Sequence, residues 1–302
     1  MPGRASSRLW SVSSCVVLLI AILLAWTWSA RDSNEASAVL ASGFRNVLVL
    51  TAHPDDETMF FGPVILHLIA AGIQVHGLCL STGNADGLGR IREDELRRAY
   101  SVLGVPPSQV TIVDNPLLQD GMSVDWDPHL VLSHTFEVSL AHNVDSILTF
   151  DSAGVSKHAN HIALHDALNN ATRFASVLQR KYQERSELKI EHMQEGTSTR
   201  PSVWVLRTPP LWQKFLGLPM ALTSHSHRLT RRKGVLGRQT TQPMEGRPSA
   251  RELQFLSSPS QYLRTLRAMR AHSSQLVWFR YLYVLFSTLM YASSIQQLLP
   301  SS

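Results

Sequence analysis

The chain has 302 residues, of which 44% are hydrophobic and 17% charged, enough for one α/β core with a sizeable interior. This composition excludes disorder of the whole chain, and two cysteines, Cys15 and Cys79, exclude a disulfide framework and a thiolate zinc site. The formal net charge of +5 comes from Arg228–Arg251, where seven basic residues accompany one acidic residue. We expect residues 225–252 to form a basic, flexible insertion, either solvated or lying against anionic headgroups; nucleic-acid binding is disfavoured because no such module is recognisable.

A charge-free apolar run extends from Leu9 to Ala30 and is long enough to cross a bilayer as a helix. Tryptophans lie near its two ends, as interfacial aromatic residues do: Trp10, Trp26 and Trp28. We expect a membrane anchor over residues 1–31, with a cleaved signal peptide as the alternative. Two arginines before the run weakly favour a cytoplasmic N-terminus.

Apolar strand candidates alternate with stretches of helical spacing after this run. The strand candidates are 46–52, 74–80, 110–114, 145–150 and 202–206, and the helical stretches are 57–71, 91–103, 127–142, 160–182 and 259–272. This alternation predicts parallel βαβ units in a Rossmann-like α/β fold, with a mostly parallel sheet and flanking helices. No Gly-x-Gly-x-x-Gly follows the first strand, so a dinucleotide site is not supported.

The first candidate site follows the first strand directly. His53, Asp55 and Asp56 lie where this strand is expected to end and a helix to begin. Ligand sites of open α/β sheets lie at the carboxyl ends of the strands, and His and Asp are zinc ligands. We expect His53 and Asp56 to bind one metal ion and Asp55 to act as a base beside metal-bound water. The alternative is an ordinary turn with a helix cap.

A second candidate cluster follows the strand at 145–150. His158 and His161 lie three residues apart at the expected start of a helix, so both imidazoles can face one point. We expect His161 to complete a three-ligand zinc site with His53 and Asp56. His158 is left as a proton carrier or oxyanion stabiliser, acting as an imidazolium whose pKa Lys157 lowers by charge repulsion.

These two clusters together resemble the LmbE-like zinc de-N-acetylase family, and more narrowly its eukaryotic membrane-bound branch. Further stretches that carry the resemblance are Met59–Phe61, Ser81–Asn84, Ile112–Asn115, Thr149–Asp151 and Gln275–Arg280. The resemblance places a deacetylase domain at 45–210 and 255–295. Where it implies glycine near positions 153 and 157, this chain has Ala153 and Lys157.

The resemblance also implies an activity. Members of this branch hydrolyse the N-acetyl group of N-acetylglucosaminyl-phosphatidylinositol in the second step of GPI-anchor synthesis, so we expect a zinc enzyme acting on a phosphatidylinositol glycolipid. It implies a single-pass protein of the endoplasmic reticulum membrane with its catalytic domain facing the cytoplasm. It also implies sugar contacts from Arg92 and Glu95, for which an ion pair within the helix is the alternative.

Two other functions remain open at the level of sequence. One is deacetylation of a soluble N-acetylglucosamine conjugate, which the apolar run disfavours. The other is a catalytically inactive membrane scaffold, which the complete His/Asp set disfavours.

Two further features lead to separate expectations. The apolar stretch Leu276–Tyr291 is expected to form either a buried closing helix or an interfacial helix. Several histidines are interpreted as ordinary helix or surface residues: His129, His134, His142, His165, His192 and His272.

Overall fold

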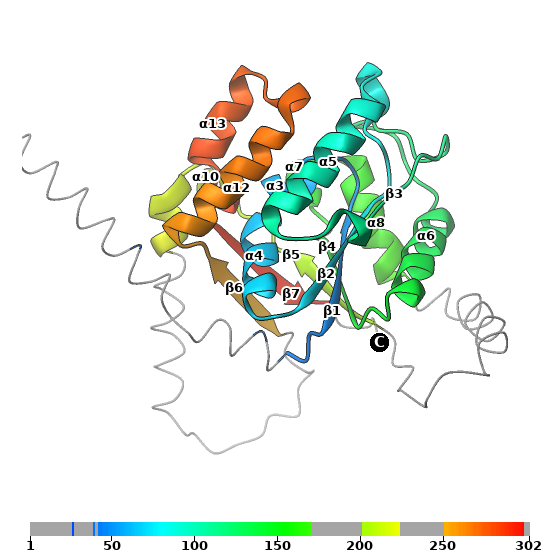
Figure 1. Cartoon of the computed structure of the whole chain (residues 1–302), viewed down its shortest axis with the longest axis horizontal. Coiled ribbons are helices and arrows are strands. Elements are labelled where there is room, and N and C mark those ends of the chain that lie inside the picture. Colours follow the sequence, from blue (N-terminus) through cyan, green and yellow to red (C-terminus); the bar gives the residue numbers. More distant parts are fainter. Residues whose placement is uncertain (1–25, 27–38, 40–41, 171–200, 224–250, 299–302) are drawn as a thin grey trace, which may run out of the picture.

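The chain folds around one seven-stranded mixed sheet (Figure 1). The computed structural model describes residues 26, 39, 42–170, 201–223 and 251–298. The strands are β1 (Asn46–Thr51), β2 (Gln74–Cys79), β3 (Val110–Ile112), β4 (Ser146–Phe150), β5 (Ser202–Leu206), β6 (Glu252–Leu256) and β7 (Ala292–Gln297). Their order in the sheet is β3-β2-β1-β4-β5-β7-β6.

The first five strands are parallel and correspond to the five predicted strands. Strand β1 lies at the centre because it is almost wholly apolar: Val49 and Leu50 have no accessible surface. The chain winds from β1 outwards to β3, then returns to the other side of β1 as β4. The strand order therefore reverses between β1 and β4, and this is the point where open α/β sheets bind ligands.

Helices cover both faces of the sheet. The main ones are α4 (Gly62–Ala70), α5 (Gly89–Leu103), α6 (Pro128–Ala141), α8 (Ala159–Asn169) and α12 (Pro259–Ala271). Helices α4, α5 and α12 pack together, and α6 packs on α8 (Figure 1). These helices agree with the predicted stretches, except that α8 ends at Asn169 and residues 171–182 lie outside the described residues.

The predicted helix over 57–71 is two helices, α3 (Asp56–Met59) and α4. Phe60 and Phe61 separate them, and Pro63 lies in the first turn of α4. Proline lacks the amide hydrogen that a continuous helix would need there, whereas it suits the start of a new helix. The break keeps the first turn after β1 short.

The sequence did not predict the two antiparallel strands, β7 and β6, at one end of the sheet. Strand β7 pairs with β5 on one side and with β6 on the other. It consists largely of Ser and Gln, so it lacks the apolar alternation that marks a strand. Strand β6 begins at Glu252, which the expected basic insertion included; residues 224–250 lie outside the described residues.

Of the two alternatives expected over 276–291, the structure does not show the buried closing helix. Residues Trp278–Phe286 form α13, in which only Val284 is buried while Trp278 is 75% exposed. Two 3₁₀ turns flank it, η3 (Ser273–Gln275) and η4 (Thr288–Met290).

The expected membrane anchor lies outside the described residues, apart from Trp26. Among the helices of the described part, none has both the length and the hydrophobicity of a membrane span.

His272 is not the ordinary helix or surface residue that was predicted. It caps the C-terminus of α12 without accessible surface, and its Nε2 lies 2.7 Å from Oε1 of the equally buried Glu57. Burial alone would lower the pKa of His272, but the charge and hydrogen bond of Glu57, with the charges of Asp55 and Glu95, raise it. The pair ties the C-terminal region to the loop after β1.

Replacing His272 by Leu should lower the free energy of unfolding by about 3–5 kcal/mol, because Glu57 is left buried without its cation. The raised pKa of His272 means that the stabilisation is complete below its unfolded pKa, about 6.5, and is lost as the pH rises through its folded pKa. Urea unfolding across this pH range measures the difference between wild type and variant, with His129→Leu on the exposed surface of α6 as control. A difference that does not shrink with rising pH would contradict a charged His272.

Candidate metal centre and active site

The loop after β1 is organised by the carboxylate of Asp56. Its Oδ2 accepts hydrogen bonds from the backbone amides of Ala52 (3.1 Å) and His53 (2.9 Å). This arrangement leaves Oδ1 free, and Oδ1 lies 3.2 Å from Nε2 of His161. Burial alone would raise the pKa of Asp56, but His161 and His53 lower it, so the carboxylate stays ionised.

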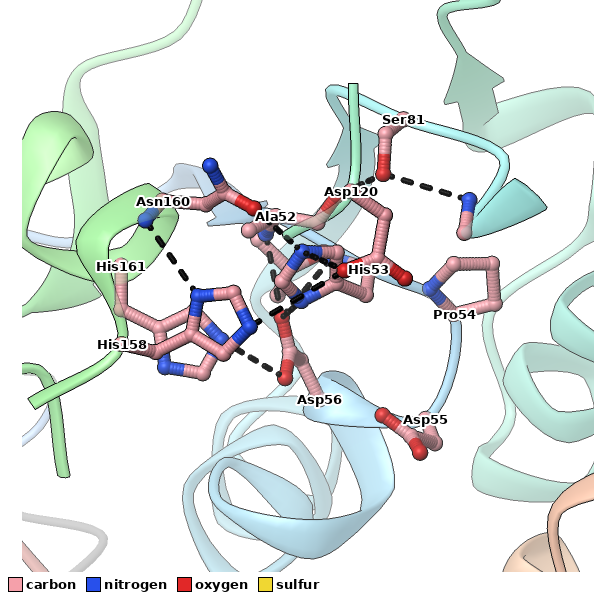
Figure 2. Close-up of polar contacts among 12 residues, drawn as sticks. Ala52, His53, Pro54, Asp55, Asp56, Ser81, Asp120, His158, Asn160 and His161 are labelled. Atoms are coloured by element: carbon pink, nitrogen blue, oxygen red, sulfur yellow. Dashed lines mark hydrogen bonds and ion pairs between the residues drawn. The ribbon is translucent and has the colours of Figure 1, made fainter. Parts of the chain in front are cut away.

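His161 approaches from the other side of the switch point, on the first turn of α8 (Figure 2). Its Nδ1 donates to the Gly154 carbonyl at 3.1 Å, and its ring stacks on Phe150 of β4 at 4.0 Å between centroids. Because Nδ1 carries the hydrogen, Nε2 presents its lone pair towards Asp56.

The loop before α8 contains unusual backbone geometry. Gly154, Val155 and Lys157 all have positive φ angles, between 54° and 60°. A β-branched residue such as Val155 adopts this conformation only under strain, and the Lys214 ammonium donates to its carbonyl at 2.9 Å. At Gly154 a Cβ would lie 3.1 Å from the Cβ of His161, so glycine permits the close approach that sets the imidazole.

His53 is oriented by two acceptors. Its Nε2 lies 3.0 Å from Oδ1 of Asn160 and 3.1 Å from Oδ1 of Asp120. Since both neighbours accept, Nε2 carries the hydrogen and the Nδ1 lone pair is left towards Asp56, 3.7 Å away. Burial would lower the pKa of His53, but Asp120 and Asp56 raise it.

These three side chains fit a metal ion. The ligand atoms of His53, Asp56 and His161 lie within 4.8 Å of one another, and all three residues are buried. The lone pairs of His161 Nε2 and Asp56 Oδ1 face each other, which is favourable only with a proton or a cation between them. Two imidazoles and one carboxylate form a donor set that zinc accepts with one position open.

A second group, His53, Asp120 and His158, also has suitably close donor atoms. It is the weaker candidate because it needs the Nε2 of His53, whose hydrogen is donated to Asp120 and Asn160. Asp120 is in addition paired with Arg92, 3.5 Å away.

Asp55 lies beside this cluster and is turned to a different partner. Its Oδ2 is 3.0 Å from Nη2 of Arg280 on α13, which also contacts the sulfur of Met59. Its φ of 112° is strained for a non-glycine residue, and Glu57 Oε2 accepts its backbone amide at 3.1 Å. Burial raises the pKa of Asp55, and the charge of Arg280 opposes this.

His158 caps the N-terminus of α8, and its Nδ1 accepts the Asn160 amide at 3.3 Å. The hydrogen is therefore on Nε2, which lies 3.9 Å from Oδ1 of Asp120. Burial and the neighbouring His53 and His161 lower the pKa of His158 to about 4. This lowering favours the neutral imidazole over the predicted imidazolium near pH 7, and its main causes are burial and the two imidazoles rather than the exposed Lys157.

Arg92 and Glu95 do not pair with each other. Arg92 donates to the carbonyls of Gly83 (2.7 Å) and Pro54 (2.8 Å) at the edge of the site. Glu95 has no accessible surface, and its carboxylate accepts three hydrogen bonds from Ser273 and Ser274, which lower its pKa against the effect of burial. The predicted sugar contact of Glu95 would compete with these hydrogen bonds inside the protein.

Three residues of the site were not predicted: Asp120, Asn160 and Arg280. Asp120 lies in an irregular loop without periodic signal. Asn160 lies inside the His158–His161 motif and is fully buried, with its amide donating to Val124 and its oxygen accepting from Gly121 and His53. Arg280 could have been recognised from the sequence, because it is the only charged residue in the apolar stretch Leu276–Tyr291.

Comparison with known proteins shows which sequences and folds this chain is similar to. The family model described as GlcNAc-PI de-N-acetylase matches residues 48–172, a span that includes His53, Asp55, Asp56, His158 and His161. A solved structure, the N,N'-diacetylchitobiose deacetylase of Pyrococcus horikoshii, shares the fold with a TM-score of 0.50 at 15% identity, covering 83% of this chain and 82% of its own. The zinc-inhibited form of teicoplanin deacetylase Orf2 also has a TM-score of 0.50, at 12% identity, covering 83% of this chain and 97% of its own.

Two curated relatives cover nearly the whole chain. The N-acetylglucosaminyl-phosphatidylinositol de-N-acetylase of Bos taurus is 33% identical over 285 residues, covering 93% of this chain and 95% of its own. The probable enzyme of the same name from Schizosaccharomyces pombe is 31% identical, covering 93% of this chain and 96% of its own. Similarity at this level along the full length places the chain in the GlcNAc-PI de-N-acetylase family.

Proposed function

We propose that this chain is a hydrolase that removes the acetyl group from N-acetylglucosaminyl-phosphatidylinositol, releasing acetate and glucosaminyl-phosphatidylinositol, the second step of GPI-anchor synthesis. The observation that carries the proposal is the buried His53, Asp56 and His161 cluster at the switch point, in a chain similar along its length to de-N-acetylases of this name. This reading disfavours an inactive scaffold, which has no need of converging lone pairs in its core.

We propose zinc as the resident metal, held by Nδ1 of His53, Oδ1 of Asp56 and Nε2 of His161. When bound there, zinc would polarise the acetyl carbonyl and lower the pKa of a water molecule to about 7. Asp56 suits this site because its other oxygen is fixed by two backbone amides, so the ligand oxygen cannot rotate away.

Asp55 and His158 each have a different role in the proton transfers. Asp55 takes a proton from the attacking water, and its raised pKa makes it a better acceptor than an ordinary aspartate. The neutral His158 offers the hydrogen of Nε2 to the carbonyl oxygen as negative charge develops there. Asp55 then returns its proton to the amine, and the glucosaminyl product leaves with acetate.

Substrate contact is proposed for Arg92 and Asp120. The buried Nε of Arg92 has no hydrogen-bond partner within the described part of the chain, so it can donate to a sugar hydroxyl. Asp120 lies between Arg92 and His53 and presents its carboxylate at the edge of the metal cluster.

A soluble N-acetylglucosamine conjugate is the second candidate substrate. Relatives from Rhodococcus opacus and others are named 1D-myo-inositol 2-acetamido-2-deoxy-alpha-D-glucopyranoside deacetylases, but the similarity covers only 44% of this chain at 28% identity. The lipid is favoured because the relatives named for it match along the whole chain. With the apolar run 9–30, this supports a further proposal: residence in the endoplasmic reticulum membrane as a single-pass protein, with the catalytic domain facing the cytoplasm.

Metal binding is tested by removing one ligand at a time. Asp56→Ala and His161→Ala should both lose bound zinc, because each takes one of three protein ligands. Elemental analysis of the purified chain measures the zinc content, and His165→Ala, one turn further along α8, should retain it. Stoichiometric zinc in either ligand variant would remove that residue from the site.

The base is tested by an isosteric change. Asp55→Asn should keep its zinc and lose about 10²–10⁴-fold in kcat, since the amide cannot accept the proton. Release of acetate from N-acetylglucosaminyl-phosphatidylinositol is the assay. Turnover within a few-fold of wild type would assign the base to another group.

Arg280 is tested as the residue that positions this base. Arg280→Gln should lower kcat while zinc content and KM change little, because Asp55 loses the cation that holds its carboxylate. Arg280→Lys should recover part of the loss, as it restores the charge without the planar fork. Equal damage from Lys and Gln, or loss of zinc, would show that the side chain acts only through packing.

A further inference from the structure

The outer side of α13 is an exposed apolar face. Six of its nine residues are large, apolar and 49–75% exposed: Trp278, Phe279, Tyr281, Leu282, Leu285 and Phe286. Scattered apolar residues on a protein surface need no explanation, but a contiguous patch marks a site of interaction.

Helix α10 (Leu211–Lys214) and the residues after it extend the face. Leu211 and Trp212 are 76% and 65% exposed, and Phe215 and Leu216 are about half exposed. The two segments touch, since Phe215 packs edge-on to Tyr283 and Thr288 Oγ1 donates to the Gln213 carbonyl at 2.6 Å. They are therefore one continuous surface, which we call the α10/α13 face.

Neither segment places a charge on this face. Across 209–223 and 276–291 the only charged residues are Lys214 and Arg280. Lys214 is 8% exposed and donates to the Val155 carbonyl, while Arg280 is paired with Asp55. A protein–protein interface usually carries a polar rim around its apolar centre. The side of a helix that enters a bilayer interface is apolar and rich in aromatic residues.

Trp26, the one described residue of the expected membrane anchor, packs next to this face. Trp26, which belongs to the charge-free run 9–30, donates to the Ser257 carbonyl and packs against Tyr262 and Tyr291. The hydroxyls of these tyrosines bind the carbonyls of Val284 and Leu285 in α13. Trp26, one residue of a run long enough to cross a bilayer, therefore lies one side chain away from α13.

Exposed apolar residues also lie on the other side of the site. Ile91 is 52% exposed and adjoins Arg92, and Met122 is 59% exposed, with its carbonyl accepting the amide of Ala159 next to His158. Single exposed apolar side chains therefore also lie near Arg92 and His158.

We propose that the α10/α13 face lies in the lipid interface, so that the catalytic domain rests on the bilayer with its site edge towards the headgroups. The occupant of the face is the membrane itself, not a second protein. The proposal deepens the proposed function, since a glycolipid headgroup would then reach His53 and Asp55 without leaving the membrane. It predicts a contact additional to the anchor.

The contact is measured on the full chain in phosphatidylcholine vesicles containing phosphatidylinositol. A polarity-sensitive fluorophore is attached at Leu282→Cys on the face and, as the matched control, at Ser101→Cys on the exposed side of α5. Cys15 is replaced by Ser, and Cys79 is left because it is buried. Label at 282 should be quenched by nitroxide attached to lipid chains and protected from iodide; label at 101 should behave in the opposite way.

Two results would overturn the proposal. Quenching of the 282 label by iodide would place α13 in water, and protection from both quenchers would mean that protein, from a second copy or from elsewhere in this chain, covers the face. Neither result depends on catalysis, so the measurement stands or fails separately from the proposed function.

Activity gives a second readout. Leu282→Ser with Leu285→Ser should lower kcat/KM by about tenfold or more on substrate in vesicles, since two apolar side chains no longer enter the lipid. Hydrolysis of the water-soluble N-acetylglucosaminyl-inositol headgroup should be unchanged. Equal loss on both substrates would indicate damage to the fold and contradict a membrane contact.

Discussion

The site depends on how Asp56 divides its carboxylate between two tasks. One oxygen closes the loop after β1 by accepting two backbone amides, and the other faces the imidazole of His161 across the switch point. The two backbone hydrogen bonds fix the position of the oxygen that faces His161. The conformation of the loop and the geometry of the metal cluster therefore depend on each other. The free-energy cost of burying this carboxylate is offset only when a cation lies beside it. The two imidazoles that face it with their lone pairs can hold such a cation.

A second layer of buried charge surrounds Asp55, and most of it comes from the C-terminal region. Glu57 holds the Asp55 backbone in its strained conformation, His272 neutralises Glu57, and Arg280 pairs with the Asp55 carboxylate. Two of these four residues belong to the segment after β6. The parallel sheet alone therefore brings the ligands together, but the base is set only when α12 and α13 close over the loop.

The parts of the fold that could be predicted from the sequence are those whose local residue pattern matches their final structure. Strands β1 to β5 are buried apolar runs, and His53 and His161 follow two of them, so the parallel topology alone brings these residues to one edge. The sequence did not predict the strands and buried residues that depend on contacts with distant parts of the chain. Strand β7 is mostly polar and is defined by its pairing with β5 and β6, Asp120 lies in a loop, and the burial of His272 is explained by its pairing with Glu57 far away in the chain.

Helix α13 shows why a charge in an apolar stretch is informative. Arg280 interrupts the apolar stretch 276–291, for which a buried closing helix or an interfacial helix was expected. In the structure the arginine points inwards to Asp55 while its neighbours Phe279 and Tyr281 point outwards. One short helix thus carries the cation of the base on its inner side and the apolar surface on its outer side. If the outer side rests on lipid, the helix that contacts the bilayer is also the helix that supplies the cation of the base.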